Sequence, residues 1–507
     1  MERTRRELLR DGAGLGAAAL LGGSAALGGV AGPARAAAAA APYAAGFSSL
    51  KHEVRLPRLE VDGRMPSWLT GVLVRNGPAL FEIGSQSYNH WFDGLAMLHG
   101  FAFGRGRVSY ANRFLRSSAY EAYKKTGKMT FSEFGTDPCR AIFSGVTSLP
   151  VLGAVPNANV SIERLGERFR ALTELPVPVR FDPDTMRTLG ADGTMPTGRL
   201  GTAHPHHDER TGERYSYEVE LVPPTMGLRI LVERGGRRRE LAFVPQEKPG
   251  YLHSFGLTDR YVAVFTQPFG FDLAKFLSPT RGPIVTNYGW DAAQPARIVL
   301  VDRAKGGVAA SIEVDPFFVF HNINAFDDAR GRVVIDVCAH KDDAIVDALY
   351  LKNLRKAGAR VPQAVPRRLT LDPATGRAEV RDLAEGNLEL PRTDYATVNR
   401  RAYRYAYGVG VKDPARSGFI DRVSKLDIKR GELTHWQERG AYPGEPVFVR
   451  RPGASRGEDD GVLLSVVLDA PHSTSYLLVL DARDLTEIAR ASVPHHIPFG
   501  FHGLYAS

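Results

Sequence analysis

The sequence predicts an all-β fold, and within that class a β-propeller, from three observations. Short runs of β-branched and aromatic residues recur from about Gly46 onward. Asp-rich turn segments separate these runs, and the 52 glycines and 33 prolines are spread along the chain rather than concentrated. No compositional linker divides residues 46–507, so a single domain is expected. About seven four-stranded blades with long insertions would account for the length, although the pattern alone leaves a β-sandwich open.

The N-terminal 42 residues resemble an export signal. Residues 4–10 (TRRELLR) match the twin-arginine pattern, an Ala/Gly/Leu run follows, and Ala34-Arg35-Ala36 is a candidate cleavage site. An N-terminal membrane anchor is the alternative, but the run is only weakly hydrophobic. We therefore expect residues 1–42 to be cleaved after export by the twin-arginine route, which places the protein in the periplasm or outside the cell.

Individual strands and helices follow from local periodicity. Strands are expected at residues 215–221, 261–266, 297–301, 332–338, 462–467 and 475–480. Helices are expected at residues 118–125 and 344–356, as excursions over the β scaffold.

Composition narrows the function classes. The formal net charge is +9, but nothing resembles a recognition helix or a zinc finger, so nucleic-acid binding is not expected. Two cysteines, Cys139 and Cys338, are too few for a disulfide scaffold or a Cys-ligated metal cluster. Whether these two form a bridge stays open.

Four histidines stand in contexts that favour metal binding. His204 precedes Pro205, which biases it toward extended backbone; His253 and His321 lie beside expected strands; His502 lies in a segment rich in glycine and aromatic residues. They are far too widely spaced for a local zinc motif, and they fit ligands that converge from separate blades. Four neutral imidazoles suit iron, copper or zinc, and iron(II) in such a site can take dioxygen.

Three glutamates are candidates to orient these ligands. Metal-bound histidines normally donate their second N–H to a carboxylate or a carbonyl. Glu174, Glu389 and Glu445 each lie in an apolar stretch with a proline close behind, which favours a fixed, buried carboxylate over a solvated one.

At these residues the sequence resembles the carotenoid cleavage oxygenases, the non-haem iron family that includes the retinoid isomerase. The resemblance covers residues 56–505. It is carried by the blocks RNGP (75–78), HWFDG (90–94), AHP (203–205), HSF (253–255), FHNINA (320–325), ELPR (389–392), GEPVFV (444–449), EDDG (458–461) and HG (502–503). SEFGT (132–136) and TQPF (266–269) are closest to the β-carotene oxygenase branch, and Leu390 departs from the Phe that is common in the family.

The resemblance implies a seven-bladed propeller with a helical and loop cap over its top face. One Fe(II) per chain would be held by the catalytic histidines His204, His253, His321 and His502. Glu174, Glu389 and Glu445 would bond three of them, and His204 would have no carboxylate partner. The implied reaction is cleavage of one C=C bond of a carotenoid or apocarotenoid by O2, giving two carbonyl products.

Other readings stay open. A dioxygenase of the same family could cleave a stilbene or another phenylpropene, and a non-catalytic propeller could bind carotenoid without cleaving it. A G-x-S-x-G match at residues 453–457 suggests a serine hydrolase, but it follows a proline and precedes an acidic turn instead of forming a strand-to-helix elbow. Peripheral membrane contact is expected for an apolar substrate, through residues 114–116 and 120–125. The oligomeric state and the cleaved bond are not predicted.

Overall fold

The computed structural model describes residues 39–137, 157–193, 198–278, 282–414, 418–454 and 457–507. Most of the predicted export signal, Cys139 and the serine of the G-x-S-x-G match lie outside these ranges. Within them, no helix has the length and apolar character needed to cross a membrane. Cys338 is a buried free thiol.

The compact unit spans Ala39–Ser507. Its first residues are tied to the fold, because the Ala41 N–H donates to the Arg355 carbonyl at 2.9 Å and Ala41 is buried. The signal boundary expected at residue 42 therefore falls inside packed structure, whereas the candidate cleavage site at residues 34–36 precedes it.

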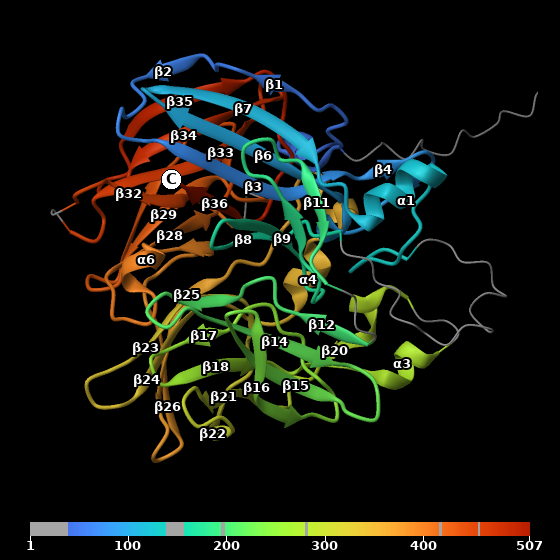
Figure 1. Ribbon diagram of the computed structural model, residues 1–507, viewed down its shortest axis with the longest axis vertical. Coiled ribbons are helices and arrows are strands. Elements are labelled where there is room, and N and C mark those ends of the chain that lie inside the picture. Colours follow the sequence, from blue (N-terminus) through green and yellow to red (C-terminus); the bar gives the residue numbers. More distant parts are fainter. Residues whose placement is uncertain (1–38, 138–156, 194–197, 279–281, 415–417, 455–456) are drawn as a thin grey trace, which may run out of the picture. The chain divides into compact units, whose positions relative to one another are not determined.

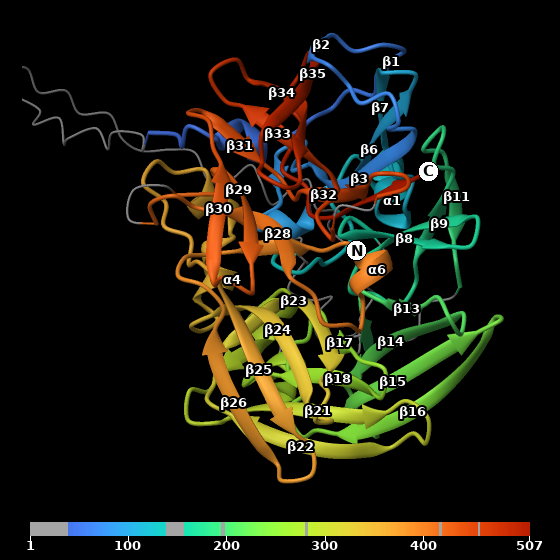
Figure 2. The same cartoon turned by 90° about the vertical axis from the view of Figure 1, so that its left-hand side faces the viewer.

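Seven antiparallel sheets of four to six strands make up the described part of this unit, and Figures 1 and 2 show them as the blades of a β-propeller. The first sheet contains β1 (Arg55–Leu56), β7 (Arg107–Phe114), β6 (Leu95–Gly104), β3 (Gly71–Leu80) and β36 (Gly503–Ala506). The second contains β11 (Thr188–Ala191), β10 (Val179–Phe181), β9 (Arg168–Leu172) and β8 (Ser161–Leu165). The third contains β12 (Arg199–Gly201), β14 (Glu213–Glu220), β15 (Gly227–Arg234) and β16 (Arg237–Pro245), with β13 (His206–Asp208) also paired to β14.

The remaining four sheets follow the same meander. The fourth contains β17 (Gly256–Leu257), β18 (Tyr261–Thr266), β21 (Ala296–Asp302) and β22 (Val308–Val314). The fifth contains β23 (Phe318–Asp327), β24 (Val333–His340), β25 (Val365–Asp372) and β26 (Arg377–Asp382). The sixth contains β27 (Glu389–Arg392), β28 (Tyr405–Gly410), β29 (Arg422–Asp427) and β30 (Glu432–Trp436). The seventh contains β2 (Val61–Gly63), β35 (Glu487–Val493), β34 (Thr474–Asp481), β33 (Gly461–Asp469) and β31 (Ala441–Pro443), with β32 (Val447–Arg450) also on β33. Two hairpins, β4 (Glu82–Ile83) with β5 (Gln86–Ser87) and β19 (Phe269–Phe271) with β20 (Tyr288–Trp290), stand apart.

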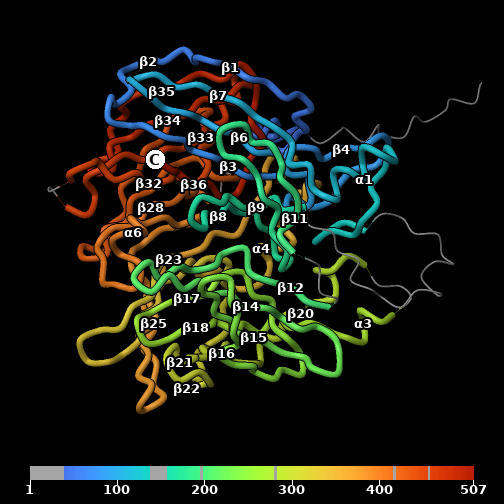
Figure 3. Tube along the Cα trace, viewed as in Figure 1, coloured from blue at the N-terminus to red at the C-terminus, as the bar shows by residue number. Residues whose placement is uncertain are grey.

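Strands from the two ends of the sequence close the ring. β36 pairs with β3, with Gly503 opposite Arg75, and β2 pairs with β35. Figure 3 shows the blue N-terminal strands beside the red C-terminal ones. Because β36 begins directly after His502, this closure also fixes the backbone that carries that histidine.

The predicted fold class and strands are confirmed. The six predicted strands match β14, β18, β21, β24, β33 and β34 to within two residues at each end. Burial explains why these strands could be recognised in the sequence. β24 and β34 are apolar and buried along most of their length, whereas outer strands such as β26 are largely exposed.

Helices are short and few in the described residues. They are α1 (Ser118–Thr126), α3 (Leu273–Leu277), α4 (Ala344–Ala348), α5 (Leu351–Leu354), α6 (Tyr395–Val398) and the 3-10 turns η1 (Ala44–Phe47), η2 (Trp91–Asp93) and η3 (Ile284–Asn287). In Figure 1, α1 and α3 lie on the right-hand side of the blades, α4 lies near the middle, and α6 lies on the left. The expected helix at 118–125 is α1, which Ser117 caps by accepting from the Tyr120 N–H.

The helix expected at 344–356 is two helices. The backbone between α4 and α5 pairs with the segment before η2: the Trp91 N–H donates to the Leu349 carbonyl at 3.1 Å, and the Leu351 N–H donates to the Asn89 carbonyl at 2.7 Å. Tyr350 is therefore extended, with φ −64° and ψ 133°. Tertiary pairing overrides the local helical periodicity here.

Much of the membrane patch expected at residues 114–116 and 120–125 is internal. Phe114, Leu115 and Tyr120 are buried, and the Tyr120 ring stacks on Phe114. These three side chains thus pack into the protein, and the exposed residues of the expected patch are Glu121, Lys124 and Lys125.

Candidate metal centre

Four blades each supply one histidine to a common point. His204 lies between β12 and β13, His253 just before β17, His321 within β23 and His502 just before β36. The Nε2 atoms of His204 and His253 are 3.0 Å apart, and those of His321 and His502 are 3.1 Å apart. One nitrogen from each ring lies within 4.8 Å of the other three. The structure therefore brings together all four histidines singled out in the sequence.

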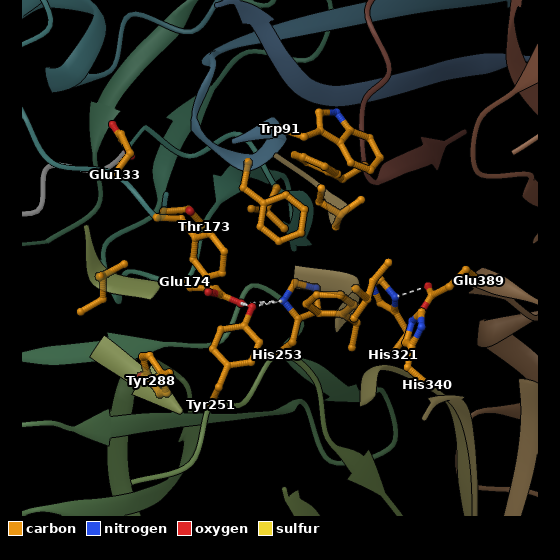
Figure 4. Close-up of a pocket in the computed structure, with 18 of the residues that line it drawn as sticks. Trp91, Glu133, Thr173, Glu174, Tyr251, His253, Tyr288, His321, His340 and Glu389 are labelled. Carbon is orange, nitrogen blue, oxygen red and sulfur yellow. Dashed lines mark hydrogen bonds and ion pairs between the residues drawn. The ribbon is translucent and has the colours of Figure 1, made fainter. Parts of the chain in front are cut away.

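Three of these rings are held from behind by carboxylates. His253 Nδ1 donates to Glu174 Oε1 at 2.6 Å, His321 Nδ1 to Glu389 Oε2 at 2.6 Å, and His502 Nδ1 to Glu445 Oε1 at 2.7 Å. Figure 4 shows the first two of these bonds as dashed lines. A proton on each Nδ1 leaves the lone pair on Nε2, which is the atom that faces the other rings.

His204 is positioned differently. Among the described residues, no carboxylate contacts its ring. Its backbone N–H donates to Thr202 Oγ1 at 2.8 Å, and Pro205 follows it directly. Backbone geometry at 202–205 therefore aims this ring, in place of a hydrogen bond to its second nitrogen.

Burial favours the neutral form of three of the imidazoles. It lowers the pKa of His502 to about 3, and it lowers the pKa of His204 and His253. For His204, the three neighbouring imidazoles add to the shift. Neutral imidazole is the form that binds a metal ion.

Glu445, the carboxylate that bonds His502, also bonds two arginines and a backbone N–H. It is fully buried, and it accepts from Arg392 Nε at 2.7 Å, from the Gly503 N–H at 2.9 Å and from Arg75 Nη1. Burial alone would raise its pKa, but the two guanidinium groups and His502 hold the pKa of this carboxyl well below its usual range. Glu445 is therefore ionised.

Both arginines also donate hydrogen bonds to backbone carbonyls of the C-terminal segment. Arg75 Nη2 donates to the Phe501 carbonyl at 3.0 Å, and Arg392 Nη2 donates to the Gly503 carbonyl. Sequence reasoning gave neither arginine a role. The signal available for Arg392 was its place three residues after Glu389, and Arg75 had none beyond its place in the RNGP block.

Two further side chains were missed. The Tyr251 hydroxyl donates to Glu174 Oε1 at 2.6 Å, and His340 Nε2 lies 3.3 Å from Glu389 Oε1. Leu390, noted in the sequence as a departure, has φ +47°. Its backbone N–H donates to Glu389 Oε2 at 2.6 Å, so a strained backbone helps to aim that carboxylate.

The histidines form part of the wall of an apolar cavity. Its lining includes His253, His321 and His502 together with aromatic and aliphatic side chains from the cap and the inner strands, among them Trp91, Phe92, Phe134, Phe276, Phe320 and Phe501. Helix α3, turn η3 and helix α4 contribute Phe276, Ile284 and Ile345. An apolar ligand could thus lie directly beside the four imidazoles.

The donor set fits a metal ion. Three rings carry their proton on Nδ1, so the close Nε2 pairs cannot all be joined by hydrogen bonds, and lone pairs converge on one point. A cation at that point would turn mutual repulsion into four coordinate bonds. Imidazole donors of this kind suit iron, copper or zinc.

Comparisons with known proteins agree over nearly the whole chain. The family model described as retinal pigment epithelial membrane protein (RPE65) matches residues 47–507. The mitochondrial carotenoid-cleaving dioxygenase of Mustela putorius furo is 35% identical over 510 residues, covering 88% of this chain and 93% of that protein. The β,β-carotene 15,15'-dioxygenase of Mus musculus is 32% identical over 514 residues, covering 90% of each.

Solved structures give the same result. A mutant of the Synechocystis apocarotenoid oxygenase (ACO) matches with a TM-score of 0.82 and 27% identity, covering 92% of this chain and 98% of that one. A cobalt-substituted form of the same oxygenase matches with a TM-score of 0.81 at the same identity and coverage.

Proposed function

Because the chain belongs to the carotenoid oxygenase family of the retinal pigment epithelial membrane protein (RPE65), we propose that it is a non-haem iron(II) dioxygenase. Its substrate is a carotenoid or an apocarotenoid, and its products are two carbonyl compounds. The observation that carries this proposal is the convergence of four imidazoles on one point, with three of them in the wall of an apolar cavity.

We propose one Fe(II) per chain, bound by the Nε2 atoms of His204, His253, His321 and His502. Bound there, the iron would supply the site at which dioxygen is activated. Four neutral ligands would leave the ion its full charge. Glu174, Glu389 and Glu445 would keep three of the rings in the Nδ1–H tautomer, and Arg75 and Arg392 would keep Glu445 ionised.

The cavity supports the overall chemistry. Adding O2 across one C=C bond and breaking that bond gives two C=O groups, so no proton is gained or lost and no external reductant is consumed. Such a reaction needs a positioned double bond and the exclusion of water more than it needs a general acid or base. Phe320 and Phe501, which line the cavity beside His321 and His502, offer flat apolar surface to a polyene.

Product analysis tests the proposal. Iron-reconstituted protein is incubated in air with β-carotene, an apocarotenal and a hydroxystilbene, and the carbonyl products are identified by mass spectrometry with labelled O2. We expect aldehydes or ketones from a polyene, each carrying label. Cleavage of the stilbene alone would favour the phenylpropene alternative, and retention of polyene without O2 uptake would favour a non-catalytic carrier.

A histidine variant and its control sharpen the result. His321→Ala should remove both iron and activity, since it deletes one of four ligands. His472→Ala, at an exposed histidine paired with Asp469, should change neither. An active, iron-replete His321→Ala protein would contradict the proposed ligand set.

We also propose export by the twin-arginine route, supported by the TRRELLR segment at residues 4–10. Replacing Arg5 and Arg6 by lysine should retain the protein in the cytoplasm, as cell fractionation would show. Peripheral membrane contact stays a prediction, and co-sedimentation of the purified protein with liposomes would test it.

A further inference from the structure

The lining of the apolar cavity includes two carboxyl residues that the proposed chemistry does not use, Glu133 and Asp137. Asp137 already accepts a hydrogen bond from Ser132 Oγ. Glu133 lines the cavity, in a neighbourhood that includes Phe134, Phe276 and Ile284. In Figure 4, Glu133 lies on the opposite side of His253 from His321, His340 and Glu389. Glu174 lies on the same side as Glu133, but Glu174 bonds His253, whereas Glu133 bonds none of the four histidines. Glu133 therefore needs a different explanation.

The backbone around Glu133 is firmly held. The Glu133 N–H donates to the Thr136 carbonyl at 2.8 Å and closes a turn. Thr136 Oγ1 donates to Asp93 Oδ2 at 2.6 Å and accepts from the Asn89 N–H at 2.7 Å, and the Gly135 N–H donates to Asp93 at 3.1 Å. The Glu133 side chain thus projects from a fixed support, as a recognition group requires.

Glu133 is the uncharged member of a carboxyl pair. Burial raises its pKa well above the usual range, and the nearby Asp93 adds to the shift. Burial raises the pKa of Asp93 to about 7, although the Thr136 hydroxyl and the Gly135 N–H donate to its carboxylate and oppose the rise. Across the part of the chain that the structure describes, no hydrogen-bond donor or acceptor meets the Glu133 carboxyl group. A protonated carboxyl facing an apolar cavity offers one O–H donor and one C=O acceptor.

The rest of the lining makes the cavity asymmetric. On the same side of His253 as Glu133, Figure 4 shows the hydroxyl-bearing residues Thr173 and Tyr288, which also line the cavity. The lining residues from α4 and from segments 361–364 and 419–420 are apolar apart from Gln363, whose amide Nε2 already donates to the Val361 carbonyl at 2.6 Å. A ligand that matches both parts has one polar end and one apolar end.

We propose that Glu133 binds a hydroxyl group on the end ring of the polyene, so that the enzyme favours hydroxylated polyenes over hydrocarbon ones. The carboxyl O–H donates to the hydroxyl oxygen, and the carboxyl C=O accepts from the hydroxyl proton. A carbonyl end group could make only the first of these bonds, and a hydrocarbon ring makes neither and leaves the carboxyl without a partner in the cavity. This inference rests on the proposed function and narrows its substrate class.

The test compares two polyenes that differ only in ring hydroxyl groups, β-carotene and its 3,3'-dihydroxy derivative. Wild type, Glu133→Gln and Glu133→Leu are loaded with iron, and kcat/KM is measured for both polyenes. In parallel, Kd is measured without oxygen from quenching of the fluorescence of Trp91, which lines the cavity. Iron content and thermal melting check that each variant is folded, and Glu121→Leu, on the exposed face of α1, serves as the control.

We expect wild type to favour the dihydroxy polyene in both kcat/KM and Kd. Glu133→Leu should lose roughly 10- to 100-fold on the dihydroxy polyene alone, as expected for a lost buried hydrogen-bonding partner. Glu133→Gln, which can still donate and accept, should retain most of the preference, and Glu121→Leu should match wild type.

Equal losses on both polyenes in Glu133→Leu, or no change on either, would overturn the inference. If wild type holds iron and cleaves neither polyene, the proposed function fails, but the Kd ratio still decides the role of Glu133. A preference in Kd that disappears in Glu133→Leu supports that role, and equal Kd values for the two polyenes refute it.

Discussion

Glu445 makes more contacts within the site than Glu174 does. It bonds His502, Arg75, Arg392 and the Gly503 N–H, and its side chain is fully buried. Glu174 performs the same task for His253, but among the described residues its carboxylate bonds only Tyr251 besides, and it is partly exposed. Both glutamates orient a histidine, but only Glu445 also neutralises two arginines and bonds the backbone of the C-terminal segment.

That difference predicts two distinct outcomes. Glu445→Gln should weaken iron binding about 10- to 100-fold and also destabilise the protein by about 3–5 kcal/mol, because it leaves Arg75 buried without its counter-charge. Glu174→Gln should weaken iron binding similarly with little loss of stability. Iron titration and urea unfolding of the iron-free proteins measure the two effects separately. Equal stability losses in both variants would show that the arginines do not depend on Glu445.

At the residue scale, the sequence was informative where chemistry alone marks a side chain. Four histidines and three glutamates stood out because imidazoles and carboxylates are unusual in apolar, proline-marked stretches. Arg75, Arg392, Tyr251 and His340 did not stand out, because their importance comes from partners that lie far away in sequence. Arg75 and Glu445, for example, meet only when the first and seventh blades are in place.

At the scale of elements, strands from neighbouring blades are joined by buried charges. Glu163 of β8 bonds Arg170 of β9 at 2.6 Å and Arg214 of β14 at 2.5 Å, and its side chain is 3% exposed. Arg214, Arg170 and His207 hold the pKa of Glu163 well below its usual range despite burial. The second and third blades are thus linked by an ionised carboxylate.

This link gives a pH-dependent prediction. Because the folded-state pKa is depressed, Glu163 contributes stability that is fully present above its unfolded pKa of about 4.5 and is lost as the pH falls below it. Glu163→Gln should therefore be destabilised relative to wild type by about 3–5 kcal/mol at pH 7 and by progressively less below pH 4.5. Urea unfolding at pH 7 and pH 3.5 measures this, and a difference that stays constant with pH would contradict it.

The closing strand β36 offers a second test at this scale. A Cβ added to Gly503 would lie 2.6 Å from Arg75 Cδ and 2.8 Å from the Val74 carbonyl oxygen, so the strand pairing would have to open. Gly503→Ala should lower both the melting temperature and the iron content, because β36 positions His502. Gly104→Ala, at a site where a Cβ meets nothing within 4 Å, is the matched control. Full iron content in Gly503→Ala would show that closure and metal binding are independent.

Strands and helices were predicted well where the local periodicity of apolar residues determines the structure. They were predicted poorly where backbone pairing with a distant segment determines it. β18 and β24 are apolar runs bounded by turns, and local signals suffice to find them. The helix expected at 344–356 has suitable periodicity but breaks at Tyr350, because the adjacent backbone bonds residues 89–91. A contact between segments so distant in sequence leaves no local mark.

On the scale of the whole molecule, the propeller explains why ligands so distant in sequence can form one site. Each histidine needs only to stand at an inner strand of its own blade, and ring closure brings the four together. The fold class followed from composition and strand spacing, but the number of blades and the pairing of β2 and β36 with their partners depend on closure. The sequence pattern alone left a sandwich open for that reason.

The central claim is that these four imidazoles bind a single ferrous ion. The most direct measurement is anaerobic reconstitution with Fe(II), followed by metal analysis and X-ray absorption spectroscopy at the iron edge. We predict one iron per chain with a first shell containing four imidazole nitrogens. A protein that binds no iron, or iron with two or fewer imidazole ligands, would contradict the account.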